Sequence, residues 1–343
     1  MHVFLAGATG VVGRRLVPLL LASRHRVTAV GRTAAKRARL ERLGAEPAAV
    51  DLFDTAAVRR AVAHHDAVIN VATHIPRSSV RMMLPGAWRE NDRIRRVVSH
   101  TLAVAAHAEG VMRFIQESFA PIYEDGGDRW VDELAPVRLA RYNRSIGDAE
   151  HSAAWFTQQR GTGVVLRFAV FYGPDAAQLV ELIAGIRKGV ALLPGRPEGF
   201  FSSVSHDDAA TAVLAALRVP AGIYNVADDE PVTRREYVDS LAQALGVAPP
   251  RFPPRWLTRL GGSLAETIGR SLRLSNRKLR DATSWEPQYR SVRQGWRPVV
   301  AALRPDGGPH AEGWARRGTT QQRDGFRHDG AGSATERRRG IHD

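Results

Sequence analysis

The amino-terminal stretch His2-Val3-Phe4-Leu5-Ala6-Gly7-Ala8-Thr9-Gly10-Val11-Val12-Gly13 runs from a short apolar segment into three glycines spaced three apart. Residues 16–21 continue with the apolar spacing of a helix, so the stretch predicts a buried strand, a tight turn and a helix. Glycine suits the backbone angles of the turn and lets a phosphate approach, while the N–H groups at the helix start favour an anion. A glycine turn without a ligand is the alternative, but its place between strand and helix favours a nucleotide. The residues expected to hold this nucleotide are Gly7, Thr9, Gly10, Val11, Val12 and Gly13.

The composition is that of a globular protein of one large domain or two unequal ones, with 343 residues of which 44% are hydrophobic. No apolar run reaches the roughly 18 residues of a membrane span, and the first strand leaves no room for a signal peptide. The absence of cysteine excludes disulfides and thiol chemistry. A cytoplasmic location is therefore expected.

The formal charge of +14 raises the question of a nucleic-acid or membrane partner. Nearly all of the basic residues are arginines, and they are spread through every segment with Glu90 and Asp92 among the densest group. No basic helix with interleaved aromatic residues is present in the sequence. We therefore expect a solvated basic surface, a small-molecule ligand and no nucleic-acid partner.

Strand and helix patterns alternate along the first half, as a parallel sheet with crossover helices requires. The predicted fold is α/β, a Rossmann-type doubly wound parallel sheet with a smaller C-terminal substrate-binding lobe. We assign residues 1–174 to the dinucleotide-binding domain, to which 203–228 return, and residues 175–202 and 229–303 to the lobe. Residues 304–343 lack apolar periodicity and are expected to be a disordered tail. The expected strands are 2–6, 26–30, 48–50, 67–71, 113–116, 164–168 and 222–226, and the main helices 34–43, 55–63, 92–108, 145–159, 179–188, 206–217 and 233–245.

The end of the second strand favours NADP(H), with NAD(H) as the alternative. An acidic residue at this point binds the ribose hydroxyls of NAD, whereas a basic one accommodates the 2′-phosphate of NADP. Here the strand ends at Arg32, whose planar guanidinium suits a phosphate. Further cofactor contacts are expected at the ends of the third and fourth strands, from Asp51, Leu52, Val71, Ala72 and Thr73.

With these residues placed, the chain resembles the extended short-chain dehydrogenase/reductase family, of the NAD-dependent epimerase/dehydratase type. The resemblance covers about residues 2–300 and depends on the order and spacing of many short motifs. They are Gly7–Gly13, Asp51-Leu52, Asn70–Thr73, Ser118, Ile122-Tyr123, Tyr142, Ala149-Glu150, Arg167, Phe171–Pro174, His206–Ala210 and Tyr224–Val226.

The resemblance implies a catalytic pair, with Tyr142 as acid or base and Ser118 polarising the substrate. In the family a lysine four residues after the tyrosine lowers the pKa of its hydroxyl. This chain has Ile146 at that position and no lysine between Lys36 and Lys188. Arg138 and Arg144 are the nearby cations, although the donors of an arginine lie elsewhere than those of a lysine.

Three functions remain open. The favoured one is an NAD(P)-dependent oxidoreductase or epimerase acting on a small carbonyl or hydroxyl compound, with another cation or a water beside Tyr142. The second is a lyase or cyclase step on the same scaffold. The third is a non-catalytic NADP-binding sensor, since a fold alone does not determine function.

Polar residues near the carboxyl ends of the strands are the candidates for substrate contacts. They are His74, Glu117, Tyr123, Arg167 and His206. No spacing of His, Asp or Glu suggests a metal site. A homodimer through the helices at 92–108 and 145–159 is possible by the same resemblance.

Overall fold

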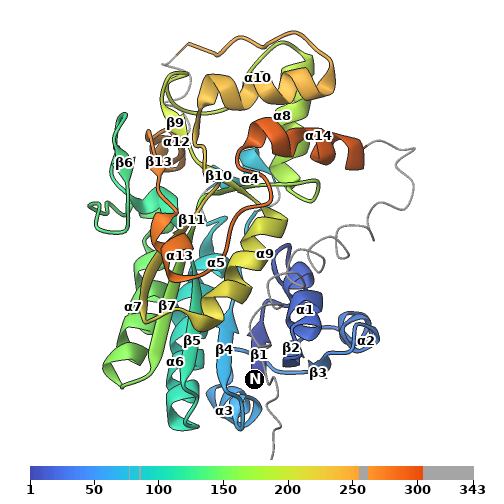
Figure 1. The fold of residues 1–343 in the computed structure, drawn as a ribbon, viewed down its shortest axis with the longest axis vertical. Coiled ribbons are helices and arrows are strands. Elements are labelled where there is room, and N and C mark those ends of the chain that lie inside the picture. The colour runs from blue at the N-terminus through green and yellow to red at the C-terminus, as the bar shows by residue number, and fades with distance from the viewer. Residues whose placement is uncertain (77, 85, 255–261, 304–343) are drawn as a thin grey trace, which may run out of the picture. The chain divides into compact units, whose positions relative to one another are not determined.

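The computed structural model describes residues 1–303 except 77, 85 and 255–261. The expected disordered tail, 304–343, lies outside the described residues. The centre is a seven-stranded sheet in the order β11-β7-β5-β4-β1-β2-β3, in which every pair of neighbours is parallel (Figure 1). Its strands are β1 (His2–Ala6), β2 (Arg26–Val30), β3 (Glu46–Ala48), β4 (Ala67–Asn70), β5 (Arg113–Phe119), β7 (Thr162–Phe168) and β11 (Gly222–Val226).

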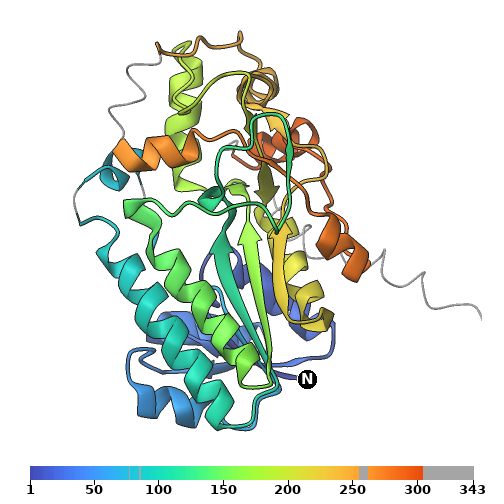
Figure 2. The ribbon, with the colours of Figure 1, turned by 90° about the vertical axis from the view of Figure 1, so that its left-hand side faces the viewer.

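Helices cover both faces of this sheet, which confirms the Rossmann-type doubly wound fold. One face packs against α1 and α9, and the other packs against α3, α6 and α7. Figure 2 shows α6 and α7 side by side along that second face. The bounds of the helices in this half are α1 (Gly13–Ala22), α2 (Ala34–Arg42), α3 (Thr55–Val62), α4 (Ser79–Met82), α5 (Arg89–Arg93), α6 (Ser99–Ala108), α7 (Ser145–Gln158) and α9 (His206–Ala215).

A second apolar cluster forms beyond the carboxyl ends of the strands, between α8, α10 and α14. Thr233 and Glu236 form the capping box at the start of α10 that their spacing predicts. The helices here are α8 (Ala177–Arg187), α10 (Arg234–Leu245), α12 (Gly262–Ile268), α13 (Arg277–Ala282) and α14 (Val292–Ala302). Three two-stranded sheets connect the segments: β6 (Trp130–Val131) with β13 (Arg273–Leu274), β8 (Val170–Tyr172) with β10 (Ser203–Ser205), and β9 (Phe200–Phe201) with β12 (Val232–Thr233).

Two of the predicted elements differ from the structure in ways that affect the site. The helix expected over 92–108 begins earlier, as α5, and is interrupted by a π-helical turn at Ile94–Val98 before α6. The fifth strand is longer than expected, because β5 pairs with β7 from Arg113 through Phe119. Residues 117 and 118 therefore lie within a strand and not in a loop after it.

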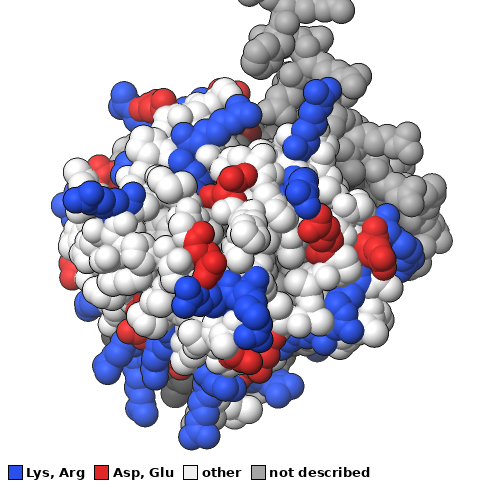
Figure 3. All heavy atoms as spheres, turned by 90° about the horizontal axis from the view of Figure 1, so that it is seen from below, with Lys and Arg blue, Asp and Glu red and all other residues white. Residues whose placement is uncertain are grey.

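The surface is basic but mixed. Figure 3 shows one face, seen from below, on which lysines and arginines alternate with aspartates and glutamates. None of the helices formed by the described residues has both the length and the apolar character needed to cross a bilayer. Within those same residues, no cluster of three or more acidic or histidine side chains could hold a metal ion.

Candidate active site

A cavity of about 1500 Å³ lies at the carboxyl ends of β1, β2, β4 and β5 and extends beneath the helices of the second apolar cluster. Between β1 and β4 the direction of chain progression reverses, since β2 and β3 follow on one side and β5 and β7 on the other. Crevices at this reversal are where doubly wound sheets bind their ligands.

The glycine turn forms one wall of the cavity. Gly7 has a φ of +87°, and an ideal Cβ on it would lie 2.6 Å from the backbone of Val71 and Ala72. Only glycine fits both the backbone angle and this close approach. A Cβ on Gly13 would overlap the backbone of Gly7 and Ala8, so Gly13 provides the close helix–strand packing that its place in the motif predicts. Helix α1 starts there without a side-chain cap, and the N–H groups of Arg14 and Arg15 donate to the carbonyls of Gly10 and Val12, both at 3.0 Å. The positive end of the helix therefore lies at the glycine turn, where it favours an anion.

The residues expected to contact the cofactor gather around this turn. All of them except Gly13, which packs behind the turn, line the cavity. They are Gly7, Thr9, Gly10, Val11, Val12, Arg32, Asp51, Leu52, Val71, Ala72 and Thr73.

The far end of the cofactor region is basic. Arg32, Lys36 and Arg37 line it together. Arg37 donates a 3.1 Å hydrogen bond to the carbonyl of Gly31, whereas the guanidinium of Arg32 is exposed and has no partner within the described part of the chain. A free guanidinium next to the ribose position is suited to a phosphate.

Tyr142 lies at the other end of the cofactor region, on a 3₁₀ turn at Arg141–Asn143 just ahead of α7. Its ring packs edge to face against Trp88, with 5.2 Å between the centroids. Its hydroxyl is buried and has no hydrogen-bond partner among the described residues. Burial raises the pKa of the Tyr142 hydroxyl, while the positive charges of Arg95 and Arg270 and the nearby side-chain amide of Asn143 act in the opposite direction.

Neither of the arginines that sequence analysis placed near Tyr142 serves it. Arg138 is half exposed and pairs with Glu266 at 3.3 Å, and Arg144 is exposed outside the cavity lining. Ile146, in the place of the family lysine, is fully buried.

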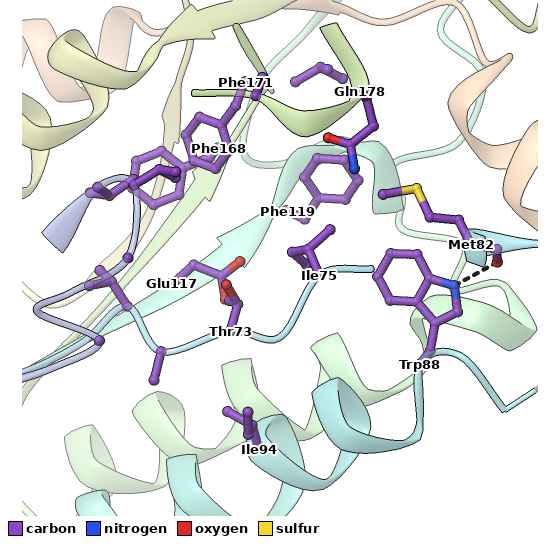
Figure 4. Close-up of a pocket in the computed structure, with 18 of the residues that line it drawn as sticks. Thr73, Ile75, Met82, Trp88, Ile94, Glu117, Phe119, Phe168, Phe171 and Gln178 are labelled. Atoms are coloured by element: carbon purple, nitrogen blue, oxygen red, sulfur yellow. Dashed lines mark hydrogen bonds between the residues drawn. The ribbon is translucent and has the colours of Figure 1, made fainter. Parts of the chain in front are cut away.

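Arg95 is the cavity-lining cation whose charge acts on Tyr142, and sequence analysis missed it. It lies in the π-helical turn, is 4% exposed and donates a 3.0 Å hydrogen bond to Glu117. Both side chains line the cavity, and Glu117 points toward Thr73 in Figure 4. The only signal in the sequence is that Arg95 directly follows Ile94, which begins a helical apolar series with Val98 and Leu102.

Ser118 does not reach the cavity, which corrects its expected role beside the substrate. Its hydroxyl donates a 2.6 Å hydrogen bond to Glu150 on α7. Glu150 in turn accepts two bonds from Arg167, of 2.8 and 2.7 Å. Successive side chains of a strand point to opposite faces, so Glu117 and Phe119 line the cavity while Ser118 faces α7.

Of the expected substrate residues, only Glu117 lines the cavity; Tyr123, Arg167, His206 and His74 do not. Tyr123 is fully buried, and its hydroxyl donates a 2.8 Å hydrogen bond to Asn225. The guanidinium of Arg167 lies over its ring, so Tyr123 and Arg167 are both part of the packed interior. His206 packs against Phe171, and burial lowers its pKa to about 3. His74 is exposed beside the cavity, where its backbone N–H donates a 2.8 Å hydrogen bond to Oδ1 of Asn91.

The part of the cavity away from the glycine turn is apolar. Figure 4 shows Phe119, Phe168 and Phe171 on one side, Ile94 on the helix below, and Trp88 and Met82 on the other side. The indole N–H of Trp88 is already used, because it donates to the carbonyl of Met82 at 2.9 Å. Tyr237 and Trp296 from the second apolar cluster line the same region.

Comparison with known proteins agrees with this geometry. Residues 7–171 match the model of an NAD(P)H-binding family. A 3-diazoavenalumate denitrifying reductase from a Streptomyces species is 30% identical over 86% of this chain and 99% of its own length. A 2-alkyl-3-oxoalkanoate reductase from Shewanella oneidensis is 27% identical over 79% of this chain and 73% of its own. Among solved structures, UDP-glucose 4-epimerase from Thermus thermophilus, in complex with NAD, aligns with a TM-score of 0.71 at 26% identity over 89% of this chain and 100% of that one.

The fold and the glycine turn define a Rossmann protein that binds a nicotinamide dinucleotide. The chain belongs to the extended short-chain dehydrogenase/reductase family, of the NAD-dependent epimerase type.

Proposed function

We propose that this protein is an NADP(H)-dependent reductase that transfers a hydride to a carbonyl-type group of a small, largely apolar molecule. The observation that carries the proposal is the hydroxyl of Tyr142, which is buried and without a partner among the described residues. Tyr142 and the glycine turn line the same cavity. Buried polar groups are normally paired, so one left free in a ligand cavity is available to a ligand.

The cofactor residues fit a dinucleotide along the whole wall. Gly7 and Gly10 leave space at the turn, and Thr73 follows β4. In this proposal Asp51 and Leu52, which also line the cavity, contact the adenine. The exposed guanidinium of Arg32 favours a phosphorylated ribose, and with it NADP(H) over NAD(H).

When bound, the reduced nicotinamide supplies a hydride. Tyr142 is the proton donor in this proposal, because a raised pKa keeps the phenol protonated at neutral pH until negative charge develops on the substrate oxygen. The carbonyl carbon gains the hydride, the oxygen takes the phenolic proton, and the product is an alcohol. Tyr142 regains its proton from water.

The apolar half of the cavity supports a substrate with a ring or an alkyl chain, held by burial and by stacking on aromatic side chains. Trp88, Phe119 and Phe171 offer such surfaces. Two of the similar proteins described above are reductases by name, which favours reduction over epimerisation.

The test is consumption of NADPH and NADH with a panel of aromatic and alkyl ketones that includes phenanthrenequinone. We expect turnover with NADPH and a loss of about 100-fold or more in kcat for Tyr142→Phe, with cofactor binding unchanged. Tyr224→Phe, which removes a hydroxyl bonded to Pro220 outside the cavity, is the matched control.

Cofactor preference is tested by the fluorescence of bound NADPH and NADH. Arg32→Ala is expected to weaken NADPH binding by about 10-fold or more and to leave NADH binding unchanged. Arg39→Ala, on the exposed side of α2, controls for the loss of one positive charge. Cofactor binding without turnover of any panel member would instead support the sensor function. Turnover without a change in nicotinamide absorbance would support the lyase or cyclase function.

A further inference from the structure

Arg95 and Glu117 form a buried ion pair inside the cavity, at the point where the polar and apolar halves meet. The side chain of Arg95 is 5% exposed and that of Glu117 is 10% exposed. Only one hydrogen bond joins them, so Nε of Arg95 and Oε2 of Glu117 have no partner in the described structure. A buried pair with unused donors and acceptors is costly to keep and is expected where function requires it.

Resting on the hydride transfer proposed above, we propose that Arg95 supplies the fixed positive charge beside Tyr142 that a lysine supplies in other members of the family. The charge comes from the neighbouring helix and not from the helix that follows the tyrosine. Glu117 acts as a positioning residue that holds the guanidinium toward the cavity.

Arg95 and Tyr142 both line the cavity, and the segments that carry them are joined by two contacts. Ser145, the first residue of α7, donates a 2.7 Å hydrogen bond to Asp92 on α5. Trp88, just ahead of α5, packs on the ring of Tyr142. These two contacts tie the segment before α7 to the helix that carries Arg95.

The π-helical turn at Ile94–Val98 determines the direction of Arg95. Such a turn closes i to i+5 and interrupts the regular spacing of side chains, and π-turns are frequent at functional sites. Ile94 and Val98 remain buried on either side, so the turn presents Arg95 to the cavity without breaking the apolar packing.

The charges that face Tyr142 come from two elements. Arg95 comes from the π-helical turn, and Arg270 follows α12. Arg270 does not line the cavity, and its Nη1 donates to the carbonyls of Tyr123 at 2.9 Å and Arg138 at 2.8 Å. The acidic residues that line the cavity are Glu117, which faces Arg95, and Asp51, Glu90 and Glu181. Arg95 is therefore the cation best placed to stabilise the phenolate of Tyr142 as its proton leaves.

The direct test measures the acidity of the residue-142 phenol without any substrate. A difluorotyrosine at position 142 has a phenol that ionises in an accessible pH range, and fluorine NMR follows its titration. We expect Arg95→Met to raise this pKa by about one unit or more and Arg95→Lys to retain most of the wild-type value. Arg96→Met, which removes an exposed arginine paired with Asp148, is the matched control and is expected to leave the pKa unchanged.

The single variant also leaves the carboxylate of Glu117 unpaired, so the double variant Arg95→Met/Glu117→Gln is measured in parallel. It removes both charges and is the variant to use if the single one does not fold, as judged by NADPH fluorescence and thermal unfolding. Loss of the carboxylate alone lowers the pKa of the phenol, so the double variant is compared with Glu117→Gln, and equal pKa values in these two variants overturn the proposal.

Kinetics with phenanthrenequinone and NADPH complete the test. We expect the double variant to lower kcat by about 10- to 100-fold with little change in the KM for NADPH, and Arg95→Lys to restore part of the loss. A wild-type protein that consumes no NADPH, combined with the pKa shift above, would refute the reductase function and leave the role of Arg95 standing. Turnover in the wild type without any pKa shift in the variants would support the reductase function and refute the role of Arg95.

Discussion

Ser118 and Phe119 are neighbours on β5 whose side chains point to opposite faces of the strand: Phe119 lines the cavity, and Ser118 donates a 2.6 Å hydrogen bond to Glu150 on α7. The hydroxyl expected beside the substrate is thus part of the scaffold. A phenyl ring takes its place in the cavity wall.

Ser118→Ala is expected to leave kcat and the cofactor affinity within about 3-fold of wild type, because no atom of the side chain reaches the cavity. The variant is expected to lose about 1–3 kcal/mol in the free energy of unfolding, since the carboxylate of Glu150, whose side chain is 15% exposed, loses a donor. Urea unfolding and steady-state kinetics measure the two effects. A 100-fold loss of kcat in a stably folded variant would contradict this assignment. Phe119→Ala, the comparison, is expected to raise the KM for an aromatic ketone.

Glu150→Gln tests the importance of the buried group behind the sheet. Glu150 accepts from Ser118 and forms a two-bond ion pair with Arg167, whose side chain is 5% exposed. Losing the carboxylate leaves a buried guanidinium unpaired, which costs about 3–5 kcal/mol. We expect a corresponding fall in the urea midpoint. Glu109→Gln is the control, because the Arg59 side chain paired with it is 61% exposed and exposed pairs contribute about 0–1 kcal/mol. Equal losses in the two variants would argue against a buried pair.

Local patterns account for what could be predicted from the sequence. The glycine turn and the ends of β2 and β4 follow from short-range periodicity, whereas β3 ends at Ala48, two residues before its expected end. Nearly all of the predicted cofactor residues line one cavity. The direction of Ser118 was missed because the fifth strand was expected to end at residue 116. In the structure the strand continues to Phe119, so its side chains still alternate between the two faces and Ser118 points away from Glu117.

Arg95 could not be identified from periodicity because its place depends on two long-range features. A π-helical turn breaks the expected helix at residue 94, and the partner Glu117 comes from a different element, 22 residues away. Neither a turn of this type nor a pairing between a helix and a strand leaves a local pattern. The same reason explains Tyr123 and Arg167, which match the family motif but face each other inside the protein.

Gly7→Ala is expected to abolish cofactor binding and to destabilise the fold. The new Cβ would overlap the backbone of Val71 and Ala72, and alanine is also strained at a φ of +87°. Gly110→Ala is the matched control, because Gly110 also has a positive φ, +70°, but nothing lies within 4 Å of its Cβ position. Gly110→Ala should therefore show the backbone cost alone, about 1–2 kcal/mol, with NADPH binding intact. Equal thermal shifts for both variants, with binding retained in both, would refute the close approach at Gly7.

His206 and Asp208 are both buried on α9, and their titrations change the free energy of unfolding with pH in opposite directions. Burial lowers the pKa of His206 to about 3 and raises that of Asp208 to about 6. Between its folded value and its ordinary value of 6.5, His206 takes up a proton only on unfolding. It therefore lowers the free energy of unfolding by about 1.4 kcal/mol for each unit that the pH falls. Asp208 holds its extra proton in the folded state between its ordinary value of 3.8 and about 6, so it stabilises the fold as the pH falls there. The two effects offset each other between about pH 4 and pH 6.

His206→Gln removes one side of this balance. We expect the variant to gain stability relative to wild type as the pH falls from 6 to 4, by up to about 1.4 kcal/mol per unit, while the difference above pH 7 stays constant. Urea unfolding of both proteins over this range gives the difference at each pH. At pH 8 His206 is neutral in both the folded and the unfolded chain, so the difference in unfolding free energy there measures only the loss of packing against Phe171. A difference that does not change with pH would mean that His206 is protonated to the same extent in the folded and unfolded chains. Its burial at the start of α9 would then have no electrostatic cost.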